Sequence, residues 1–335
     1  MMRLPPFTYL APVSVDDAVK LMADHGRDAM LVAGGTDLYP NMKRRQFEPK
    51  VLVGLRAIKE LVGVTGNASG GITIGAGTTL TATSLHAEIA GHYPALATAA
   101  GLVSTPQLRN MGTLGGNVCV DTRCNYYNQS YQWRKAVNFC MKKDGAICLV
   151  APGSPRCWAV SSSDTAPVLW SLGATARLLG PAGERVIPMA ALYRDDGIEY
   201  LAKRPEEILT EIALPPADGL RCAYLKLRRR GSFDFPVLGV AAALRMEGET
   251  VREGRIVLGA VASLPREAVE AGRLLAGQRL TPELIEEVAT AAARPSKPLD
   301  NTDLTHPYRK KMTRVFVSRA LRRLAGFTEG AESRA

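Results

Sequence analysis

The stretch Ala-Met-Leu-Val-Ala-Gly-Gly-Thr-Asp-Leu, residues 29–38, decides the fold of the first half of this chain. Its five apolar residues predict a buried strand, and the two glycines after them predict a tight turn into a helix. Glycines let a backbone approach an anion, and free N–H groups at a helix start bind phosphate. The turn has neither the GxGxxG pattern nor the lysine of a Walker loop. Alone, it is more typical of an ordinary strand–helix connection than of a ligand site.

A second glycine-rich segment strengthens the case for a ligand site. Residues 106–117 end in Thr-Leu-Gly-Gly-Asn, and an acidic residue, Asp164, follows 47 positions after Asn117. Paired glycine turns followed by an acid suit a dinucleotide, whose pyrophosphate and polyol chain need different partners.

Length and composition bound the class of protein. The chain has 335 residues, of which 46% are hydrophobic and 22% charged. These values predict two or three globular domains and exclude a disordered, collagen-like or low-complexity protein. No apolar run approaches the roughly 18 residues of a membrane span, and residues 1–6 lack the apolar stretch of a secretory signal. We therefore expect a cytoplasmic protein that does not act at a membrane.

Local patterns predict the elements around the two glycine turns. A helix is expected to begin after the N-cap Ser14 and to end at Gly26. Residues 103–166 have weak periodicity but many cysteines and aromatics, which favours a segment organised around a group over a disordered loop. Strands are expected at 29–33, 51–55, 71–77, 208–214, 223–228, 237–245 and 255–262, and helices at 79–89, 94–102, 281–293 and 306–325. The apolar stripe expected on the last helix consists of Tyr308, Met312, Val315 and Leu324.

Four motifs in series carry a family resemblance. Residues 33–38, 113–117, 164–167 and 224–230 together resemble the FAD-binding subunits of the xanthine dehydrogenase and molybdenum hydroxylase family, over nearly the whole chain. The resemblance implies an α+β protein with a two-part FAD-binding domain of the vanillyl-alcohol-oxidase type, followed by a smaller domain of the CO-dehydrogenase flavoprotein C-terminal type. It also implies a molybdopterin-binding large subunit and a [2Fe–2S] small subunit as partners, in a doubled heterotrimer. The implied boundaries are 1–216 (subdomains 1–58 and 59–216), 217–327, and a frayed tail at 328–335.

The resemblance assigns FAD contacts to named residues and implies no catalytic residue, because the flavin carries the chemistry. Asp164 is expected to hydrogen-bond the ribityl or adenosine end of FAD, and Lys226 to reach the flavin. Val103 and Leu209 occupy positions that supply apolar contacts. The residues expected to cradle the pyrophosphate through backbone amides are Leu31, Val32, Ala33, Gly34, Gly35, Thr36, Asp37, Leu38, Thr113, Leu114, Gly115, Gly116 and Asn117.

Cysteines are crowded into one part of the chain. Five of the six lie between positions 119 and 157, which in a cytosolic protein indicates metal or redox chemistry rather than disulfides. Cys119 and Cys222 are interpreted as packing residues. Four thiolates satisfy either a tetrahedral zinc or a [4Fe–4S] cluster, and the spacing does not decide between them, although a flavin on the same chain favours the cluster. The four expected ligands are Cys124, Cys140, Cys148 and Cys157.

An insertion of about 40 residues sharpens the resemblance to one branch. Its sequence at 121–130, Asp-Thr-Arg-Cys-Asn-Tyr-Tyr-Asn-Gln-Ser, and the later cysteines resemble the β subunit of 4-hydroxybenzoyl-CoA reductase. This resemblance implies a [4Fe–4S] cluster on the four cysteines, at about 120–160. It also implies electron flow from reduced ferredoxin through the cluster and FAD to the [2Fe–2S] subunit and the molybdopterin site, where an aromatic acyl-CoA is reductively dehydroxylated. The alternatives are a related hydroxylase with another substrate and a zinc-stabilised subunit without redox work.

The net charge of +10 is compatible with an acidic partner. Nucleic-acid binding is not expected, because the basic residues are dispersed and no helix-turn-helix, zinc-finger or RNA-binding signature is present. The basic residues expected to help dock an acidic ferredoxin are Arg123, Arg134, Lys135, Lys142 and Lys143.

Overall fold

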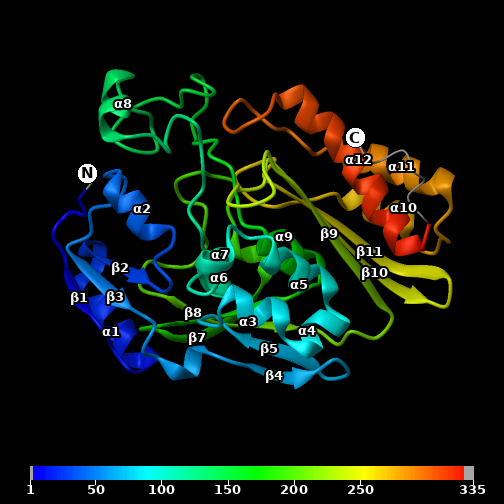
Figure 1. The fold of residues 1–335 in the computed structure, drawn as a ribbon, viewed down its shortest axis with the longest axis horizontal. Helices are drawn as coiled ribbons and strands as arrows, with labels where there is room; N and C mark the ends of the chain where they lie inside the picture. Colours follow the sequence, from blue (N-terminus) through cyan, green and yellow to red (C-terminus); the bar gives the residue numbers. More distant parts are fainter. Residues whose placement is uncertain (1–2, 328–335) are drawn as a thin grey trace.

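A short parallel sheet organises the N-terminal part of the computed structural model, which describes residues 3–327 (Figure 1). The elements here are β1 (Thr8–Leu10), α1 (Val15–His25), η1 (Gly26–Asp28), β2 (Ala29–Val32), α2 (Leu38–Lys43) and β3 (Val51–Gly54). The strand order is β1-β3-β2. Helix α1 is bounded as the sequence predicts, because the Ser14 side chain accepts a hydrogen bond from the Asp17 N–H and Gly26 ends the helix at φ +50°. Strand β2 then leads through the first glycine turn into α2.

A five-stranded antiparallel sheet forms the centre of the molecule. Its strands, in the order β4-β5-β8-β6-β7, are β4 (Val64–Asn67), β5 (Gly71–Gly75), β8 (Ile208–Leu214), β6 (Thr175–Gly180) and β7 (Gly183–Pro188). The short helices of this part are η2 (Lys59–Leu61), α3 (Leu80–Leu85), α4 (Ala87–His92), α5 (Pro94–Gly101), α6 (Pro106–Arg109), α7 (Leu114–Val118), α9 (Thr165–Ser171) and η3 (Met189–Leu192). The helix predicted at 79–89 is divided, because His86 has extended backbone angles and separates α3 from α4.

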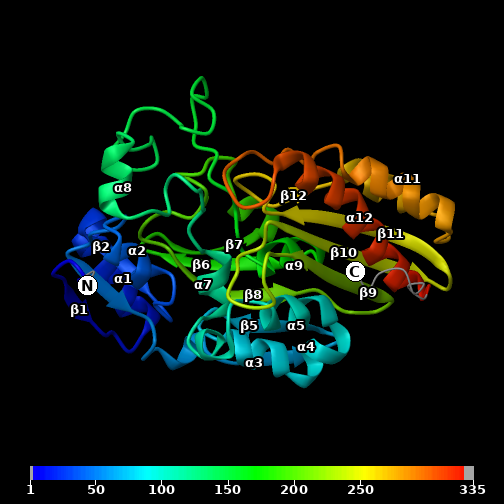
Figure 2. The ribbon, with the colours of Figure 1, turned by 45° about the horizontal axis from the view of Figure 1, so that its top comes forward.

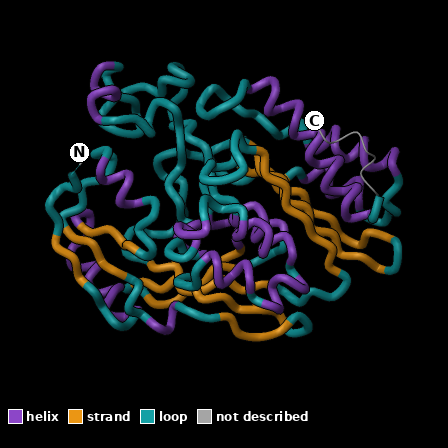
Figure 3. The backbone as a smooth tube through the Cα atoms, viewed as in Figure 1, coloured by secondary structure: helices purple, strands orange, loops and turns teal. Residues whose placement is uncertain are grey.

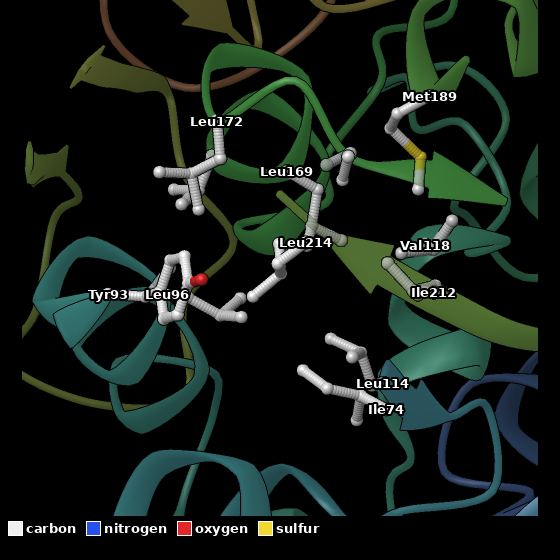
Figure 4. Close-up of a cluster of buried hydrophobic side chains, with 14 of the residues drawn as sticks. Ile74, Tyr93, Leu96, Leu114, Val118, Leu169, Leu172, Met189, Ile212 and Leu214 are labelled. Atoms are coloured by element: carbon white, nitrogen blue, oxygen red, sulfur yellow. The ribbon is translucent and has the colours of Figure 1, made fainter. Parts of the chain in front are cut away.

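The largest buried cluster lies between this sheet and its helices (Figure 4). Ile74 and Ile212 extend from the sheet, while Leu96 comes from α5 and Leu169 from α9, and all four are fully buried. Leu114 of the second glycine motif is also fully buried here. The core therefore fixes the position of that motif through its own apolar residue.

The C-terminal part is a four-stranded antiparallel sheet covered by three helices (Figure 1). Its elements are β9 (Leu220–Leu227), β10 (Leu238–Glu247), β11 (Thr250–Gly259), β12 (Arg266–Glu267), α10 (Val269–Leu275), α11 (Pro282–Ala292) and α12 (His306–Ala325), and the strand order is β12-β11-β10-β9. The tail predicted at 328–335 lies outside the described residues. Parallel and antiparallel sheets with packed helices confirm the predicted α+β class.

The predicted apolar stripe of α12 is confirmed for Met312, Val315 and Leu324, which pack against the C-terminal core, but the buried face also contains a residue that the stripe omits. Tyr308 is 44% exposed, whereas Arg309 is fully buried and donates hydrogen bonds to the carbonyls of Val237, Leu299 and Ala260. Burial lowers the pKa of Arg309 to about 10. The apolar pattern could not indicate Arg309, because this arginine is satisfied by carbonyls of other segments of the chain.

The cysteine-rich insertion is a loop segment that stands out from the central sheet, with one short helix, α8 (Tyr131–Ala136) (Figures 2 and 3). Its two ends are joined by a bridge in which the N–H and carbonyl groups of Arg123 and Val160 exchange hydrogen bonds of 2.9 and 2.7 Å. The buried Arg134 side chain fixes the outer part to the N-terminal subdomain through a 2.9 Å hydrogen bond to the Arg44 carbonyl. The insertion is thus a closed segment attached at both its base and its side.

None of the helices in residues 3–327 is both long enough and apolar enough to cross a membrane.

Candidate flavin site and cysteine cluster

The first glycine turn lies against the segment that leads into the second. A Cβ atom on Gly34 would lie 2.0 Å from the Met111 carbonyl oxygen, and one on Gly115 would lie 2.9 Å from the Ala76 carbonyl oxygen. Gly35 has φ +69°, a left-handed conformation that glycine adopts without strain. Because both approaches are to backbone atoms, no side chain fits at Gly34 or Gly115. The structure therefore brings the two predicted motifs together.

The first turn supplies most of the free backbone donors of this site. The N–H groups of residues 34–37 donate no hydrogen bond to another residue within the described range. In the second motif, the Gly115 N–H donates to the Ala76 carbonyl at 2.8 Å, and the Gly116 N–H donates to the Thr113 hydroxyl at 3.0 Å. Free N–H groups just before a helix are the donors that phosphate oxygens need. In this arrangement the first turn offers donors to an anion, and the second supports the backbone around it.

The Asn117 side chain joins the second motif to the predicted acidic motif. Its Oδ1 accepts hydrogen bonds from the hydroxyls of Ser163 and Thr165 at 2.8 and 2.7 Å, and from the Thr165 N–H at 3.2 Å. These contacts flank Asp164 on both sides and hold it in the interior, where it is 2% exposed. Asn117 and Asp164 are therefore parts of one structural unit.

Asp164 forms a buried ion pair with Lys226, which comes from β9 of the C-terminal sheet. The Lys226 Nζ lies 2.8 Å from one Asp164 oxygen, the Tyr224 hydroxyl donates to the other at 2.7 Å, and both charged side chains are at most 3% exposed. Burial raises the pKa of Asp164 and lowers that of Lys226, while the pairing of the two charges opposes both changes. Lys226 also donates to the Leu102 carbonyl at 3.1 Å. The two residues expected to contact different parts of FAD are thus direct partners.

The apolar residues predicted to contact the cofactor occupy different surroundings. Leu209 is 6% exposed and belongs to the central core. Val103 is partly exposed and accepts a hydrogen bond from Arg109 through its carbonyl at 2.8 Å. On either side of the first turn, Leu31 of β2 packs with the buried apolar residues of α1, whereas Val32 of β2 and Leu38 of α2 pack in a separate cluster of the N-terminal sheet. Ala33, partly exposed, connects β2 to the turn.

Family models cover almost the whole chain. The model for the FAD binding domain in molybdopterin dehydrogenase matches residues 5–217, and the model for the CO dehydrogenase flavoprotein C-terminal domain matches residues 222–324. This chain is an FAD-binding medium subunit of the xanthine dehydrogenase and carbon monoxide dehydrogenase family. FAD binding and membership of an oxidoreductase are thereby confirmed.

Individual relatives agree with this family assignment. The medium chain of carbon monoxide dehydrogenase from Afipia carboxidovorans is 32% identical over 318 residues, covering 95% of this chain and 96% of the relative. The FAD-binding subunit of xanthine dehydrogenase from Escherichia coli O157:H7 is 24% identical, covering 95% and 97%. A solved Cu,Mo-CO dehydrogenase chain superposes with a TM-score of 0.80 at 31% identity, covering 98% of this chain and all of that one.

The four predicted cysteine ligands of this FAD-binding subunit are all buried and free of disulfides. Cys124, Cys140 and Cys157 share one buried cluster, and Cys148 is 5% exposed and lies close enough to Cys157 to affect the pKa of its thiol. Cys124 and Cys157 lie just inside the Arg123–Val160 bridge. Cys119 and Cys222 instead pack with the central core, as expected of packing residues.

The surroundings of these thiols combine burial with backbone donors. Burial raises the pKa of Cys124 to about 12 and that of Cys157 to about 11. The Ala159 N–H lies 3.4 Å from the Cys157 sulfur, and the backbone of Tyr126 and Tyr127 donates to Cys124. N–H groups aimed at sulfur are the donors that stabilise thiolate ligands.

No group of three or more His, Cys, Asp or Glu side chains surrounds a single metal-ion position anywhere in residues 3–327. Each cysteine of a [4Fe–4S] cluster binds a different iron, so its four sulfurs do not need to converge on one point. The residue types, their burial and their N–H donors are compatible with such a cluster.

The structure corrects the predicted docking role of the basic residues in the insertion. Arg134 is 1% exposed, and the Lys142 side chain is 5% exposed and paired with Asp121 at 2.7 Å. Lys142 also donates to the Gly197 carbonyl at 2.8 Å. Both side chains bind carbonyl or carboxylate groups inside the protein, and the sequence does not show that these partners lie nearby. The docking prediction is therefore wrong for Arg134 and Lys142.

Arg123 is also partly buried, with its side chain 16% exposed, and it has a role that the sequence did not indicate. Its guanidinium forms an ion pair with Asp37 of the first glycine turn and stacks on the Phe235 ring at 3.8 Å. The Asp37 and Arg123 positions are 86 residues apart, and no local pattern connects them.

Proposed function

We propose that this subunit holds a [4Fe–4S] cluster on Cys124, Cys140, Cys148 and Cys157 and transfers electrons between that cluster and FAD. The observation that carries the proposal is the burial of four free cysteines in a closed segment whose base contacts the first glycine turn. Clustered, buried thiols without disulfides need another reason to be together, and a metal cluster supplies one.

The residues of this chain have distinct tasks in such a conduit. FAD, when bound, supplies chemistry that accepts and donates electrons. The N–H groups of residues 34–37 bind the pyrophosphate, and the second motif at 113–117 shapes the backbone around it. Asp164 and Lys226 fix the flavin end relative to the C-terminal sheet through their buried ion pair. Val103 and Leu209 line the apolar part of the site.

The proposed enzyme is similar to 4-hydroxybenzoyl-CoA reductase. Reduced ferredoxin is the donor, and electrons leave FAD for a [2Fe–2S] small subunit and a molybdopterin-binding large subunit in a doubled heterotrimer in the cytoplasm. The substrate at the molybdenum is an aromatic acyl-CoA that loses a phenolic hydroxyl. Support comes from the insertion at about 120–160, together with the confirmed family. The domain boundaries at 58, 216 and 327 belong to the same proposal.

Metal analysis of the anaerobically purified chain tests the cluster. We expect about four irons and four sulfides for each flavin, and a broad iron–sulfur absorption beneath the flavin bands. Cys140→Ser is expected to lose iron and that absorption while keeping FAD. Cys222→Ser, which changes a buried cysteine in the central core, is the matched control and should keep both. One zinc per chain without iron would contradict the proposal.

A second candidate is a related hydroxylase with another substrate. It is favoured by the 32% identity to a carbon monoxide dehydrogenase medium chain. Adding reduced ferredoxin to the assembled enzyme distinguishes the reductase from the hydroxylase. Fast flavin reduction supports the reductase, whereas flavin reduction only by an oxidisable substrate supports the hydroxylase.

A further inference from the structure

Asp37 places a negative charge inside the turn that is proposed to bind an anion. Its carboxylate lies at the start of α2, next to the free N–H groups of residues 34–37. Burial already raises the pKa of Asp37, which shows that its charged form is poorly solvated here. A pyrophosphate bound at the same turn would repel this carboxylate. The turn therefore needs a compensating positive charge.

Arg123 supplies that charge from the base of the cysteine-rich insertion. It forms the ion pair with one Asp37 oxygen, while the Asn41 side chain donates to the other at 3.0 Å. The guanidinium also stacks on the Phe235 ring at 3.8 Å, and the backbone bridge to Val160 fixes the Arg123 main chain. Arg123 is thus fixed before any ligand arrives and loses little freedom on binding.

We propose that Arg123 is a positioning residue that neutralises Asp37, so that the first glycine turn can bind the FAD pyrophosphate. The inference rests on the proposed role of that turn. It means that the insertion contributes directly to FAD binding, because the residue before Cys124 completes the charge balance of the flavin site. An intact insertion base is then a condition for tight FAD binding.

FAD titration of the deflavinated full-length chain, followed by flavin fluorescence, tests the proposal. Arg123→Met is expected to weaken FAD binding about tenfold or more, because it leaves the partly buried Asp37 carboxylate without its counter-charge next to the pyrophosphate. Asp37→Asn in the Arg123→Met background is expected to restore the affinity to within about threefold of the natural chain, because the neutral amide needs no counter-charge. A purely structural role of Arg123 would not be rescued in this way.

Arg156 offers a closely matched control at the other end of the insertion. It pairs with Asp195 at 3.0 Å and stacks on the Trp158 ring at 3.6 Å, with its side chain 24% exposed, but it is not paired with the glycine turn. Arg156→Met should leave FAD affinity within about twofold of the natural chain. Equal losses in the Arg123→Met and Arg156→Met variants, or no rescue by Asp37→Asn, would overturn the inference. Failure of the natural chain itself to bind FAD would instead overturn the proposed role of the turn, and this inference with it.

Discussion

Replacing Lys226 with methionine tests the buried ion pair that joins the central and C-terminal sheets. Methionine keeps much of the side-chain volume but removes the ammonium, which leaves the 3% exposed Asp164 side chain with only the Tyr224 hydroxyl as partner. Removing one member of a buried pair costs about 3–5 kcal/mol. We expect the lower end, about 3 kcal/mol, because burial raises the pKa of Asp164 and so makes protonation of the orphaned carboxyl easier.

That free energy corresponds to a measurable shift of the melting temperature. An unfolding entropy of about 2.1 cal/mol/K for each of 335 residues gives about 0.7 kcal/mol/K, so about 3 kcal/mol lowers Tm by about 4 °C. Scanning calorimetry with and without excess FAD separates this loss from any loss of cofactor binding. The exposed pair of Lys50 and Asp28, with side chains 76% and 54% exposed, provides the control. Lys50→Met is expected to lower Tm by about 1 °C or less.

A double variant distinguishes the ion pair from simple packing. Adding Asp164→Asn to Lys226→Met removes the orphaned negative charge, and the amide oxygen of the new side chain still accepts a hydrogen bond from the Tyr224 hydroxyl. The double variant should therefore recover more than half of the decrease in Tm caused by Lys226→Met. The reasoning is refuted if Lys226→Met costs no more than Lys50→Met, or if the double variant melts no higher than the single one.

Two further changes probe the glycine turn and the central sheet. Gly34→Ala should lower the amount of bound FAD at least about tenfold, because the added Cβ would lie 2.0 Å from the Met111 carbonyl oxygen. Gly91→Ala is the control and should keep its FAD, because a Cβ at Gly91 would have no atom within 4 Å. Equal flavin content in both variants would contradict this expectation. Arg185 lowers the pKa of Glu207 below its ordinary value of 4.5, so their bond stabilises the fold at neutral pH and is lost as pH falls through the lowered folded pKa. Melting curves should show Glu207→Gln less stable than the natural chain at pH 7, with a difference that shrinks as the carboxyl is protonated at acidic pH. A pH-independent difference would contradict this expectation.

Features with local signals could be predicted from the sequence. The bounds of the last helix agree at both ends, because a proline lies in its first turn and Gly326 adopts φ +76° directly after it. The strand at Ile208–Leu214 also agrees, because Pro215 follows it directly. The meeting of the two glycine turns could be expected too, because both motifs belong to one cofactor pattern. The helix and strand signals lie within a few residues of the features that they predict, whereas the meeting of the two turns is expected from the family pattern.

Buried charges could not be predicted in this way. Arg309, Arg134 and Lys142 read as surface residues, yet each ends at carbonyl or carboxylate groups that come from distant segments. The pair of Arg123 and Asp37 has the same character. A long basic side chain is stable inside a protein only when such partners surround it, and the partners are fixed by the fold rather than by neighbouring residues. The assignment of four cysteine ligands stays a prediction until metal is measured.

These buried residues also change the meaning of the net charge of +10. Arg123 and Lys142 are each paired with a carboxylate, Asp37 and Asp121, so these two basic side chains add little to a surface field that attracts an acidic partner. Within the insertion, Lys135 is exposed and Lys143 partly exposed, close in sequence to the exposed Tyr131 and Trp133 on α8. A ferredoxin that docks on the insertion would therefore meet a mixed aromatic and basic surface rather than a strongly basic one. Aromatic side chains contribute more to such contacts than solvated lysines do, so shape and burial should govern this encounter more than long-range attraction.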